Sequence, residues 1–283
     1  MHNKIILLTG ATAGIGLAAA RALCAQGHQV IGVGRSAERC AQAETQIRAE
    51  TPDAQIQFRL ADLSSLQQVR ALAEALRGDL ARLDGLVNNA GTVTSAYTLS
   101  QDGYELQFAV NHLAGFLLAR ELLPLLRAAA AQNGEARGIT VSSASHRSGR
   151  IHWEDVMLRK GYNPLKAYEQ SKVANVLFSV EFNRRYAAEG LRAYAADPGL
   201  VKTEIGFKGT RGIVRWFWEL RRLGGSPPEV GAATAVHLAT QPLAAQREEV
   251  YWFKCRPAQA SRYALRADEA GRLWELSEQL CKS

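Results

Sequence analysis

Two tyrosines in the chain each stand four residues before a lysine, a spacing that can support proton transfer. The pairs are Tyr162 with Lys166 and Tyr168 with Lys172. On a helix, side chains four residues apart lie on the same face and can meet. A free tyrosine has a pKa of about 10, which makes it a poor base at neutral pH, and a neighbouring ammonium group favours its phenolate form. Either pair could form an acid–base group, and the spacing alone does not choose between them.

A proline inside the first pair favours the second. Pro164 stands between Tyr162 and its lysine, and it disfavours a continuous helix through the residue before it. The second pair opens an uninterrupted amphipathic stretch, Lys172-Val-Ala-Asn-Val-Leu-Phe-Ser-Val-Glu-Phe. We therefore predict that Tyr168 and Lys172 face one cleft from a helix, and that Tyr162 is a loop residue.

A glycine-rich turn follows the first apolar run of the chain. After Ile5–Leu8 the sequence reads Thr9-Gly-Ala-Thr-Ala-Gly-Ile-Gly. Glycines permit a tight turn and let the backbone approach a pyrophosphate, while the N-terminus of the following helix offers free N–H groups. The spacing is G-x-x-x-G-x-G rather than the G-x-G-x-x-G of the common dinucleotide-binding turn. We predict a cofactor loop here, and a purely structural glycine-rich turn is the alternative.

The residue after the second apolar run indicates which nicotinamide cofactor is used. The run ends in Val33-Gly-Arg35-Ser, where an enzyme that selects NAD would carry an acidic residue for the ribose 2′-hydroxyl. The guanidinium of Arg35 suits a 2′-phosphate instead. The sequence thus favours NADP(H), and the alternative is an ordinary surface arginine.

Short apolar runs that alternate with longer amphipathic segments must position these residues. The predicted strands are Ile5–Leu8, Val30–Val33, Ile56–Leu60, Leu86–Val87, Gly138–Val141, Ala193–Ala195 and Val250–Phe253. The predicted helices are Ile15–Gln26, Ala37–Glu50, Leu66–Leu76, Gly103–Arg127 and Tyr168–Glu189. Apolar strands separated by helices indicate an α/β fold with one doubly wound parallel sheet of about seven strands and helices on both faces. Ligands bind at the carboxyl ends of such strands, where each motif above is found.

Composition narrows the classes of protein that the chain could represent. Apolar residues make up 47% and charged residues 22% of 283 residues, without repeats or linkers, which predicts a single globular domain over 1–283. The net charge of +7 comes with no aromatic–basic or helix-turn-helix pattern, so nucleic acid is not an expected partner. The excess is mostly dispersed arginine, and a solvated basic surface is the simplest interpretation.

The cysteines and the N-terminus bear on the cellular location. Cys24, Cys40, Cys255 and Cys281 are far apart and form no CxxC pair, so neither a disulfide framework nor a metal site is expected. Reduced thiols fit a cytoplasmic protein. The apolar run near the N-terminus has four residues, Ile5–Leu8, too few for a signal peptide or a membrane span.

These motifs together resemble the short-chain dehydrogenase/reductase superfamily over nearly the whole chain. In the family order they are the glycine loop, Asp62, Asn88-Asn89-Ala90-Gly91, Asn111, Ser142-Ser143, the Tyr168/Lys172 pair and Pro198-Gly199-Leu200-Val201-Lys202-Thr203. The resemblance is greatest to the retinol-dehydrogenase-like branch. The stretches that carry it are Val110–Gly115, Val141–His146, Gly149–Trp153 and Arg272–Glu275. It implies a Rossmann-type fold, and no N-terminal membrane anchor like that of some relatives is expected here.

The resemblance assigns four catalytic roles. Tyr168 would donate a proton to the substrate carbonyl oxygen, or accept one in the reverse direction. Lys172 would lower the pKa of Tyr168 and hold the nicotinamide ribose, and Asn111 would help to position Lys172 through a water relay. Ser143 would hydrogen-bond the substrate oxygen.

Two other serines compete with Ser143 for its role. Ser142 and Ser145 are close to it in the chain, and the family motif selects the second serine of the Ser142-Ser143 pair. Ser143 and Tyr168 are 25 residues apart, which is consistent with the longer insertion of this branch.

The resemblance also implies the residues that bind NADP(H). Asp62 and Leu63 would contact the adenine, Asn88 and Gly91 the adenosine side, and Thr203 the nicotinamide carboxamide. Asp197 is a departure, because relatives often have His or Asn before Pro-Gly. The full predicted set is Gly10, Thr12, Ala13, Gly14, Ile15, Gly16, Arg35, Asp62, Leu63, Asn88, Ala90, Gly91, Tyr168, Lys172, Pro198, Gly199, Val201 and Thr203.

The segment 207–223 falls where the family places its variable substrate lid. Its apolar residues share one helical face opposite its arginines, which fits a lid near 204–225, simple packing on the core, or contact with a membrane surface. Three consecutive aromatic residues, Trp216, Phe217 and Trp218, favour a lid over a hydrophobic substrate. His146 and His152 could line the entrance, although exposed loop histidines are the simpler expectation.

We therefore predict an NADP(H)-dependent oxidoreductase that interconverts a hydrophobic ketone or aldehyde and its alcohol. One alternative is reduction of an activated C=C bond, and another is a regulatory protein that senses NADP(H) without turnover. Homo-oligomers could form through the predicted helices Gly103–Arg127 and Tyr168–Glu189.

Overall fold

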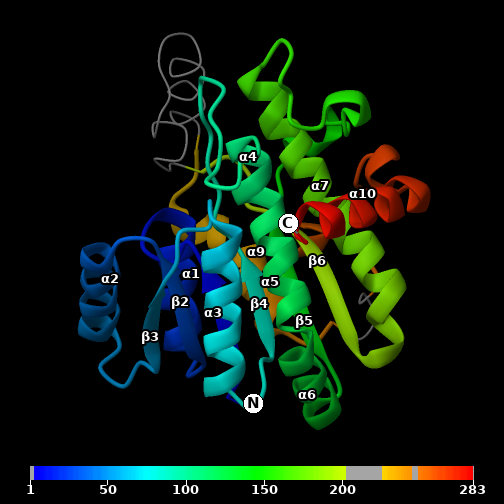
Figure 1. The fold of residues 1–283 in the computed structure, drawn as a ribbon. Coiled ribbons are helices and arrows are strands. Elements are labelled where there is room, and N and C mark those ends of the chain that lie inside the picture. Colours follow the sequence, from blue (N-terminus) through cyan, green and yellow to red (C-terminus); the bar gives the residue numbers. More distant parts are fainter. Residues whose placement is uncertain (1–2, 202–224, 244–247, 283) are drawn as a thin grey trace.

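The computed structural model describes residues 3–201, 225–243 and 248–282, and it contains one eight-stranded sheet (Figure 1). The sheet order is β3-β2-β1-β4-β5-β6-β7-β8. Its strands are β1 (Ile5–Thr9), β2 (Gln29–Gly34), β3 (Ile56–Leu60), β4 (Gly85–Asn88), β5 (Ala136–Val141), β6 (Leu191–Asp197), β7 (Tyr251–Phe253) and β8 (Arg256–Pro257). From β1 the strand order runs through β2 and β3 to one edge of the sheet, and from β4 it runs through β5 and β6 toward the other. The sheet is therefore doubly wound, which confirms the predicted α/β class.

The last strand departs from the prediction of about seven parallel strands. β1 to β7 pair in parallel, whereas β8 returns antiparallel to β7. The two turn residues between them, Lys254 and Cys255, both have positive φ angles, as tight hairpins require. A strand of two residues is too short to show any alternation of apolar and polar positions, so the sequence did not reveal it.

Helices cover both faces of the sheet. They are α1 (Gly14–Ala25), α2 (Ala37–Glu50), α3 (Leu66–Asp79), α4 (Leu106–Phe108), α5 (Ala114–Glu121), α6 (Leu123–Asn133), α7 (Pro164–Tyr186), α9 (Pro228–Thr240) and α10 (Ala267–Leu280). Apolar side chains of α1, α2 and α9 form one core cluster, and those of α3, α5, α6, α7 and α10 form another. Along β1, Ile6 and Leu8 belong to the first cluster and Leu7 to the second, because side chains alternate between the faces of a strand.

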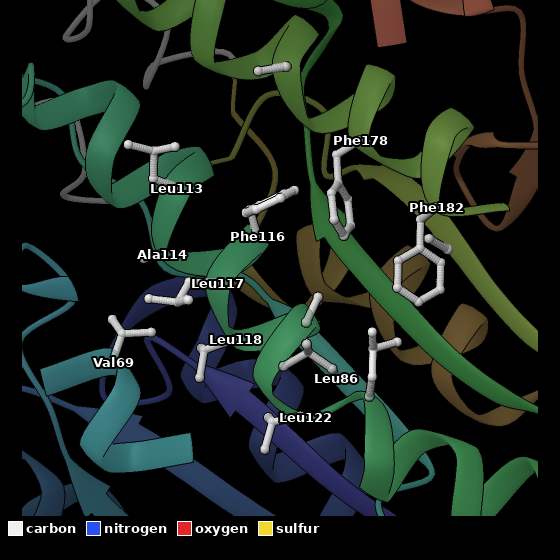
Figure 2. Close-up of a cluster of buried hydrophobic side chains, with 14 of the residues drawn as sticks. Val69, Leu86, Leu113, Ala114, Phe116, Leu117, Leu118, Leu122, Phe178 and Phe182 are labelled. Atoms are coloured by element: carbon white, nitrogen blue, oxygen red, sulfur yellow. The ribbon is translucent and has the colours of Figure 1, made fainter. Parts of the chain in front are cut away.

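Helix α5 lies at the centre of the second cluster. Figure 2 shows its side chains between Val69 of α3 and the two phenylalanines Phe178 and Phe182 of α7. The ring of Trp274, from α10, stacks on Phe178 with 5.8 Å between the centroids. Helix α10 therefore covers a face of α7. This helix is not among those predicted from the sequence.

Two predicted helix boundaries are wrong. Helix α7 begins at Pro164 rather than Tyr168, because proline is well suited to the first turn of a helix, where its missing N–H removes no hydrogen bond. The predicted helix Gly103–Arg127 begins at Leu106, where the buried side chain of Glu105 caps it, and it breaks between α5 and α6. Pro124 in the first turn of α6 accounts for that break.

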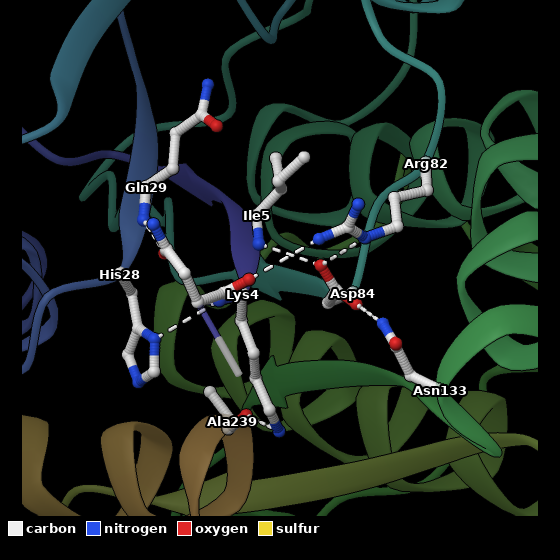
Figure 3. Close-up of polar contacts among 9 residues, drawn as sticks. Lys4, Ile5, His28, Gln29, Arg82, Asp84, Asn133 and Ala239 are labelled. Carbon is white, nitrogen blue, oxygen red and sulfur yellow. Dashed lines mark hydrogen bonds and ion pairs between the residues drawn. The ribbon is translucent and has the colours of Figure 1, made fainter. Parts of the chain in front are cut away.

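The amino ends of the strands are held together by a polar cluster far from the predicted site (Figure 3). The buried carboxylate of Asp84 accepts hydrogen bonds from the backbone N–H of Ile5 and from the side chains of Arg82 and Asn133. His28 accepts a hydrogen bond from the backbone of Lys4. This cluster fixes the start of β1, so its ionisable residues have a structural explanation.

Candidate active site

The residues predicted to bind the cofactor follow the carboxyl ends of five parallel strands. Because these strands run in the same direction, their carboxyl ends lie at one edge of the sheet. Gly10, Thr12, Ala13, Gly14, Ile15 and Gly16 follow β1, Arg35 follows β2, Asp62 and Leu63 follow β3, Asn88, Ala90 and Gly91 end or follow β4, and Pro198, Gly199 and Val201 follow β6. Thr203 and nearly all of the predicted lid near 204–225 lie outside the described residues.

The glycine loop after β1 leaves no room for a side chain at Gly10 or Gly16. Gly10 has a φ of +67°, and a Cβ on Gly16 would lie 2.1 Å from the carbonyl oxygen of Gly10. Helix α1 begins directly after Ala13, and no side chain caps its N-terminus. The first N–H groups of α1 are thus left for an anion such as a pyrophosphate.

Hydrogen bonds between the end of β1 and the segment after β4 hold this loop in place, and they were not predicted from the sequence. The hydroxyl oxygen of Thr9 accepts hydrogen bonds from the backbone N–H groups of Asn89 and Ala90, each at 3.0 Å. The Asn89 amide donates to the carbonyl oxygens of Thr9 and Gly10, at 2.9 and 3.3 Å. The Asn-Asn-Ala-Gly motif indicates polar contacts at this position. The sequence alone does not show which of its two asparagines faces the glycine loop.

Arg35 is exposed beside the glycine loop. The backbone of Gly10 and Ala11 donates to the carbonyl oxygen of Val33, two residues before Arg35. The absent side chain of Gly34 leaves room for Thr12, whose methyl carbon lies 2.7 Å from where a Cβ would be. Within the described part of the chain, no hydrogen bond or ion pair engages the Arg35 guanidinium, which is thus available to a ligand.

The side chains after β3 and at the end of β4 serve local structure. The carboxylate of Asp62 accepts from the backbone and hydroxyl of Ser64 and from Gln101. The amide of Asn88 donates to the carbonyl oxygen of Gly115 on α5 at 3.2 Å. Both side chains therefore hold local structure at the carboxyl edge of the sheet, and their predicted contacts with a cofactor stay a prediction.

Lys172 is a buried cation with a lowered pKa at this edge of the sheet. Its side chain is buried, and its Nζ donates to the carbonyl oxygen of Val141 at 3.0 Å. The same Nζ lies 5.4 Å from the centroid of the Tyr168 ring. Burial lowers the pKa of Lys172 to about 8, and the negative charge of Asp197 partly offsets that effect. Tyr168, in contrast to Lys172, is only partly buried.

The structure separates the two serines at the end of β5. Ser142 is buried, and its hydroxyl donates to the carbonyl oxygen of Lys172 at 2.9 Å. Ser143 is partly exposed, and its hydroxyl contacts only Ser145 among the residues described. The second serine is therefore the one that can turn toward a substrate.

Asn111 lies in a π-helical turn, Ala109–Leu113. Its side chain accepts from the backbone N–H of Thr92 at 2.7 Å and donates to the carbonyl oxygen of Thr92 and to the hydroxyl of Ser171. Such turns often mark functional sites. Asn111 thus ties the loop after β4 to α7 beside Lys172, and its predicted water relay stays a prediction.

His146 corrects one prediction. It is fully buried rather than exposed. Its Nδ1 lies 2.7 Å from the carbonyl oxygen of Ser143, and its Nε2 lies 3.1 Å from the backbone nitrogen of Ser261. Because that N–H must donate to Nε2, Nδ1 carries the proton and donates to Ser143. His152 is also partly buried.

Tyr162, from the other Tyr/Lys pair, forms hydrogen bonds away from Lys172. Tyr162 precedes α7, as predicted, and its hydroxyl accepts from Gln107 at 2.8 Å and also contacts Thr94. Asn163 caps the first turn of the helix. Tyr162 therefore fastens the loop before α7.

Gln170 holds the insertion between β5 and α7. This buried residue accepts from the backbone N–H of His152 at 2.9 Å and donates to the carbonyl oxygen of Val156 at 2.8 Å. The indole of Trp153 donates to Glu269 of α10. The insertion is thus anchored on both α7 and α10, which sequence spacing gave no means of predicting.

Comparisons with known proteins agree with this arrangement. The family model described as short chain dehydrogenase matches residues 4–211. Mouse retinol dehydrogenase 14 and human retinol dehydrogenase 11 are each 34% identical, and the alignments cover 98% of this chain and 86% and 85% of those proteins. The chain therefore belongs to the short-chain dehydrogenase/reductase family, in its retinol-dehydrogenase-like branch.

Solved structures show the same fold. The structure of an uncharacterized protein from Mycobacterium paratuberculosis is 34% identical, with a TM-score of 0.78 over 99% of this chain and 94% of that one. A complex of Pseudomonas aeruginosa RhlG with NADP is 28% identical, with a TM-score of 0.70 over 94% of this chain and 100% of that one. The family and the fold make the chain an oxidoreductase of alcohols and carbonyl compounds that uses a nicotinamide cofactor.

Proposed function

We propose that this protein is an NADP(H)-dependent oxidoreductase that interconverts a hydrophobic ketone or aldehyde and its alcohol, with Tyr168 as the general acid and base. The observation that carries the proposal is the placement of Lys172. The ammonium of Lys172 is buried beside Tyr168, and the partly exposed Ser143 follows the end of β5. Together these groups are suited to proton transfer.

The cofactor loop fits a dinucleotide. Only glycine fits at position 16, and the uncapped N-terminus of α1 offers N–H groups to a pyrophosphate. We infer that this loop, the strand-end residues predicted above and Lys172 hold NADP(H). When bound, NADPH supplies the hydride for carbonyl reduction.

The residues of the chain itself handle the proton. Tyr168 gives its phenolic proton to the substrate carbonyl oxygen, and the ammonium of Lys172 stabilises the phenolate that is left. Ser143 donates a hydrogen bond to the same oxygen and so fixes the substrate beside Tyr168. In alcohol oxidation the same groups act in reverse, with Tyr168 as the base.

The choice of NADP(H) rests on Arg35. Arg35 is an exposed residue directly after β2, and its neighbour Gly34 lies against Thr12 of the glycine loop. From this position its guanidinium can pair with a 2′-phosphate through two hydrogen bonds. The bound NADP named for the RhlG structure is consistent with this choice. A hydrophobic substrate is supported by the retinol in the names of the mammalian relatives, since retinol is an apolar alcohol.

Two further properties belong to the proposal. We infer a cytoplasmic protein, because all four cysteines are free thiols, as expected in a reducing compartment. Within the described residues, no helix has the length and apolar composition to cross a membrane. Association through α7 would have to accommodate α10, which already covers one of its faces.

The first experiment is a titration of the purified protein with NADPH and NADH, followed by nicotinamide fluorescence. Hydrophobic aldehydes, ketones and activated alkenes are then added one class at a time. We expect NADPH to bind more tightly than NADH and to be oxidised when a carbonyl compound is present. Binding of neither nucleotide would contradict the cofactor assignment, and oxidation with alkenes alone would replace carbonyl reduction by C=C reduction.

A further inference from the structure

Asp197 occupies an unusual place for a carboxylate. It is the last residue of β6 and is only 5% exposed. Its neighbour Ala196 pairs with Val141 of β5, and Val141 is the residue whose carbonyl oxygen binds Lys172. The register of the sheet therefore sets Asp197 at the carboxyl end of the strand next to Val141, within reach of the charge of the buried ammonium.

Both oxygens of Asp197 accept hydrogen bonds. Oδ1 accepts from the backbone N–H of Gly199 at 2.8 Å, and Oδ2 accepts from the hydroxyl of Tyr251 on β7. Gly199 has a φ of +72°, so this short loop depends on glycine to turn. The carboxylate thus closes the Pro-Gly turn after β6 and ties it to β7.

The contacts of Tyr251 extend to the serine segment. Its ring lies 4.5 Å from the ring of His146, centroid to centroid, and His146 is bonded to the backbone of Ser143. Burial raises the pKa of Tyr251, with a further contribution from Asp197, so its hydroxyl keeps its proton and remains a donor. Asp197, Tyr251 and His146 form a continuous set of contacts from the Pro-Gly turn to the end of β5.

Lys172 and Asp197 carry opposite charges at this edge of the sheet. Burial lowers the pKa of His146, which leaves its ring neutral at pH 7. Arg147, whose charge also acts on Tyr251 and His146, is an exposed residue. A buried ammonium is unfavourable without a compensating charge, and Asp197 provides one from the neighbouring strand.

We propose that Asp197 is a positioning residue that keeps Lys172 in its charged form and fixes the Pro198-Gly199 turn at the cofactor-binding edge. Its consequence for catalysis rests on the proposed function above, whereas its effect on Lys172 belongs to the protein without any ligand. The two consequences can therefore be measured separately.

The first test follows the protonation of Lys172 by NMR in the nucleotide-free protein. The signal of its side chain is identified by its absence in Lys172→Arg. Asp197→Asn keeps the shape and can still accept from Gly199, but it removes the charge. Tyr251→Phe is the matched control, because it breaks the other hydrogen bond and leaves the carboxylate.

We expect Lys172 in Asp197→Asn to lose its proton about one pH unit lower than in the wild type, as befits loss of a nearby opposite charge. In Tyr251→Phe the midpoint should stay within a few tenths of a unit. An unchanged midpoint in Asp197→Asn overturns the proposal. Asn has nearly the same shape as Asp, so this variant should fold, and Asp197→Ser serves as a second uncharged variant.

The second test is the pH profile of kcat/KM for carbonyl reduction. If the ammonium of Lys172 is required, the alkaline limb in Asp197→Asn moves to lower pH, because the lysine now deprotonates earlier. A residue with only a structural role would lower the whole profile without moving that limb. A shifted Lys172 titration in a protein without turnover would keep the proposal and reject the proposed function.

Discussion

The Nζ of Lys172 lies 3.0 Å from the carbonyl oxygen of Val141 and 5.4 Å from the centroid of the Tyr168 ring. This relationship places a charged group in a buried position, where its pKa falls to about 8. Burial of a charge lowers the stability of the folded protein. Groups with pKa values shifted by burial are common at functional sites. A positive charge this close to the ring favours the phenolate form of Tyr168.

Replacing Lys172 should therefore make the protein more stable and inactive. In the folded state its pKa is lowered from 10.5 to about 8, so the unfolded state binds the proton more tightly. The resulting destabilisation is fully present below pH 8 and disappears above pH 10.5, and it amounts to at most about 3 kcal/mol at pH 7. Lys172→Met should recover part of this lost stability. The carbonyl oxygen of Val141 stays hydrogen-bonded in the variant, because the side chain of Asn175 also donates to it.

The measurement is urea unfolding of the wild type and Lys172→Met at pH 7 and again near pH 10. The gain in free energy of unfolding should be present at pH 7 and shrink as the pH rises. A variant less stable than the wild type at pH 7 would show that burial of the ammonium is not what opposes stability here. Turnover should be lost in either case.

A second pH effect arises at His112. Burial lowers its pKa to about 4, and its Nε2 lies 2.9 Å from the hydroxyl of Ser277 on α10. Because the folded state resists protonation, the unfolded state binds more protons between about pH 6.5 and 4. Stability contributed by neutral His112 therefore falls as the pH drops through this range, by about 2 kcal/mol between pH 7 and 5.

His112→Gln removes the titrating group and keeps a donor for Ser277. We expect the loss of stability between pH 7 and 5, measured by urea unfolding, to be smaller in this variant by about 2 kcal/mol. The matched control His152→Gln replaces a less buried histidine and should change the difference much less. Equal pH dependence in His112→Gln and the wild type would contradict the assignment.

The glycine loop offers a test of cofactor binding that needs no substrate. In Gly16→Ala the new methyl group would meet the carbonyl oxygen of Gly10 and the amide of Asn89, at 2.1 and 2.5 Å. The loop must then shift, and we expect NADPH affinity to fall at least about tenfold because the pyrophosphate contacts depend on this backbone.

The matched control is Gly271→Ala in α10, where a Cβ would meet nothing within 4 Å. This variant should gain roughly 0.5–1 kcal/mol of stability from its helical position and bind NADPH normally. Normal binding by Gly16→Ala, measured in the same fluorescence titration, would show that this loop does not hold the cofactor.

Arg35 should decide between the two nicotinamide cofactors. Loss of a charge-assisted hydrogen-bonding partner for the 2′-phosphate removes about 1.5–3 kcal/mol, so Arg35→Ala should weaken NADPH binding roughly 10- to 100-fold. NADH lacks that phosphate and serves as the internal control, with an unchanged dissociation constant. Equal weakening of both nucleotides would indicate a general electrostatic effect of Arg35.

Local patterns predicted the parts of the fold that depend on neighbouring residues. The predicted strand Ile56–Leu60 and the predicted helix Ala37–Glu50 agree with the structure at both ends. The ends of the helix are marked locally, by Ser36 as its cap and by Pro52 shortly after it. The glycine loop and the Tyr168/Lys172 pair were identified by spacing within one segment, and the structure places both at the same edge of the sheet.

Contacts between distant segments were beyond the reach of such patterns. Burial of His146 depends on Tyr251 and Ser261, more than a hundred residues later in the chain. The partnership of Asp197 with Tyr251 likewise joins two strands that only the sheet order brings together. A sequence shows which residues carry chemistry, whereas their burial and partners follow from the packing of the whole sheet.

The most direct test of the central claim compares Tyr168→Phe with Tyr162→Phe. Each variant removes one hydroxyl from a tyrosine that precedes a lysine by four residues, and only Tyr168 lies beside a buried ammonium. We predict that Tyr168→Phe loses carbonyl reduction by at least about a hundredfold, while NADPH binding stays largely intact because only one hydroxyl is removed. Tyr162→Phe should keep its turnover and lose only stability. Normal turnover by Tyr168→Phe would contradict the account.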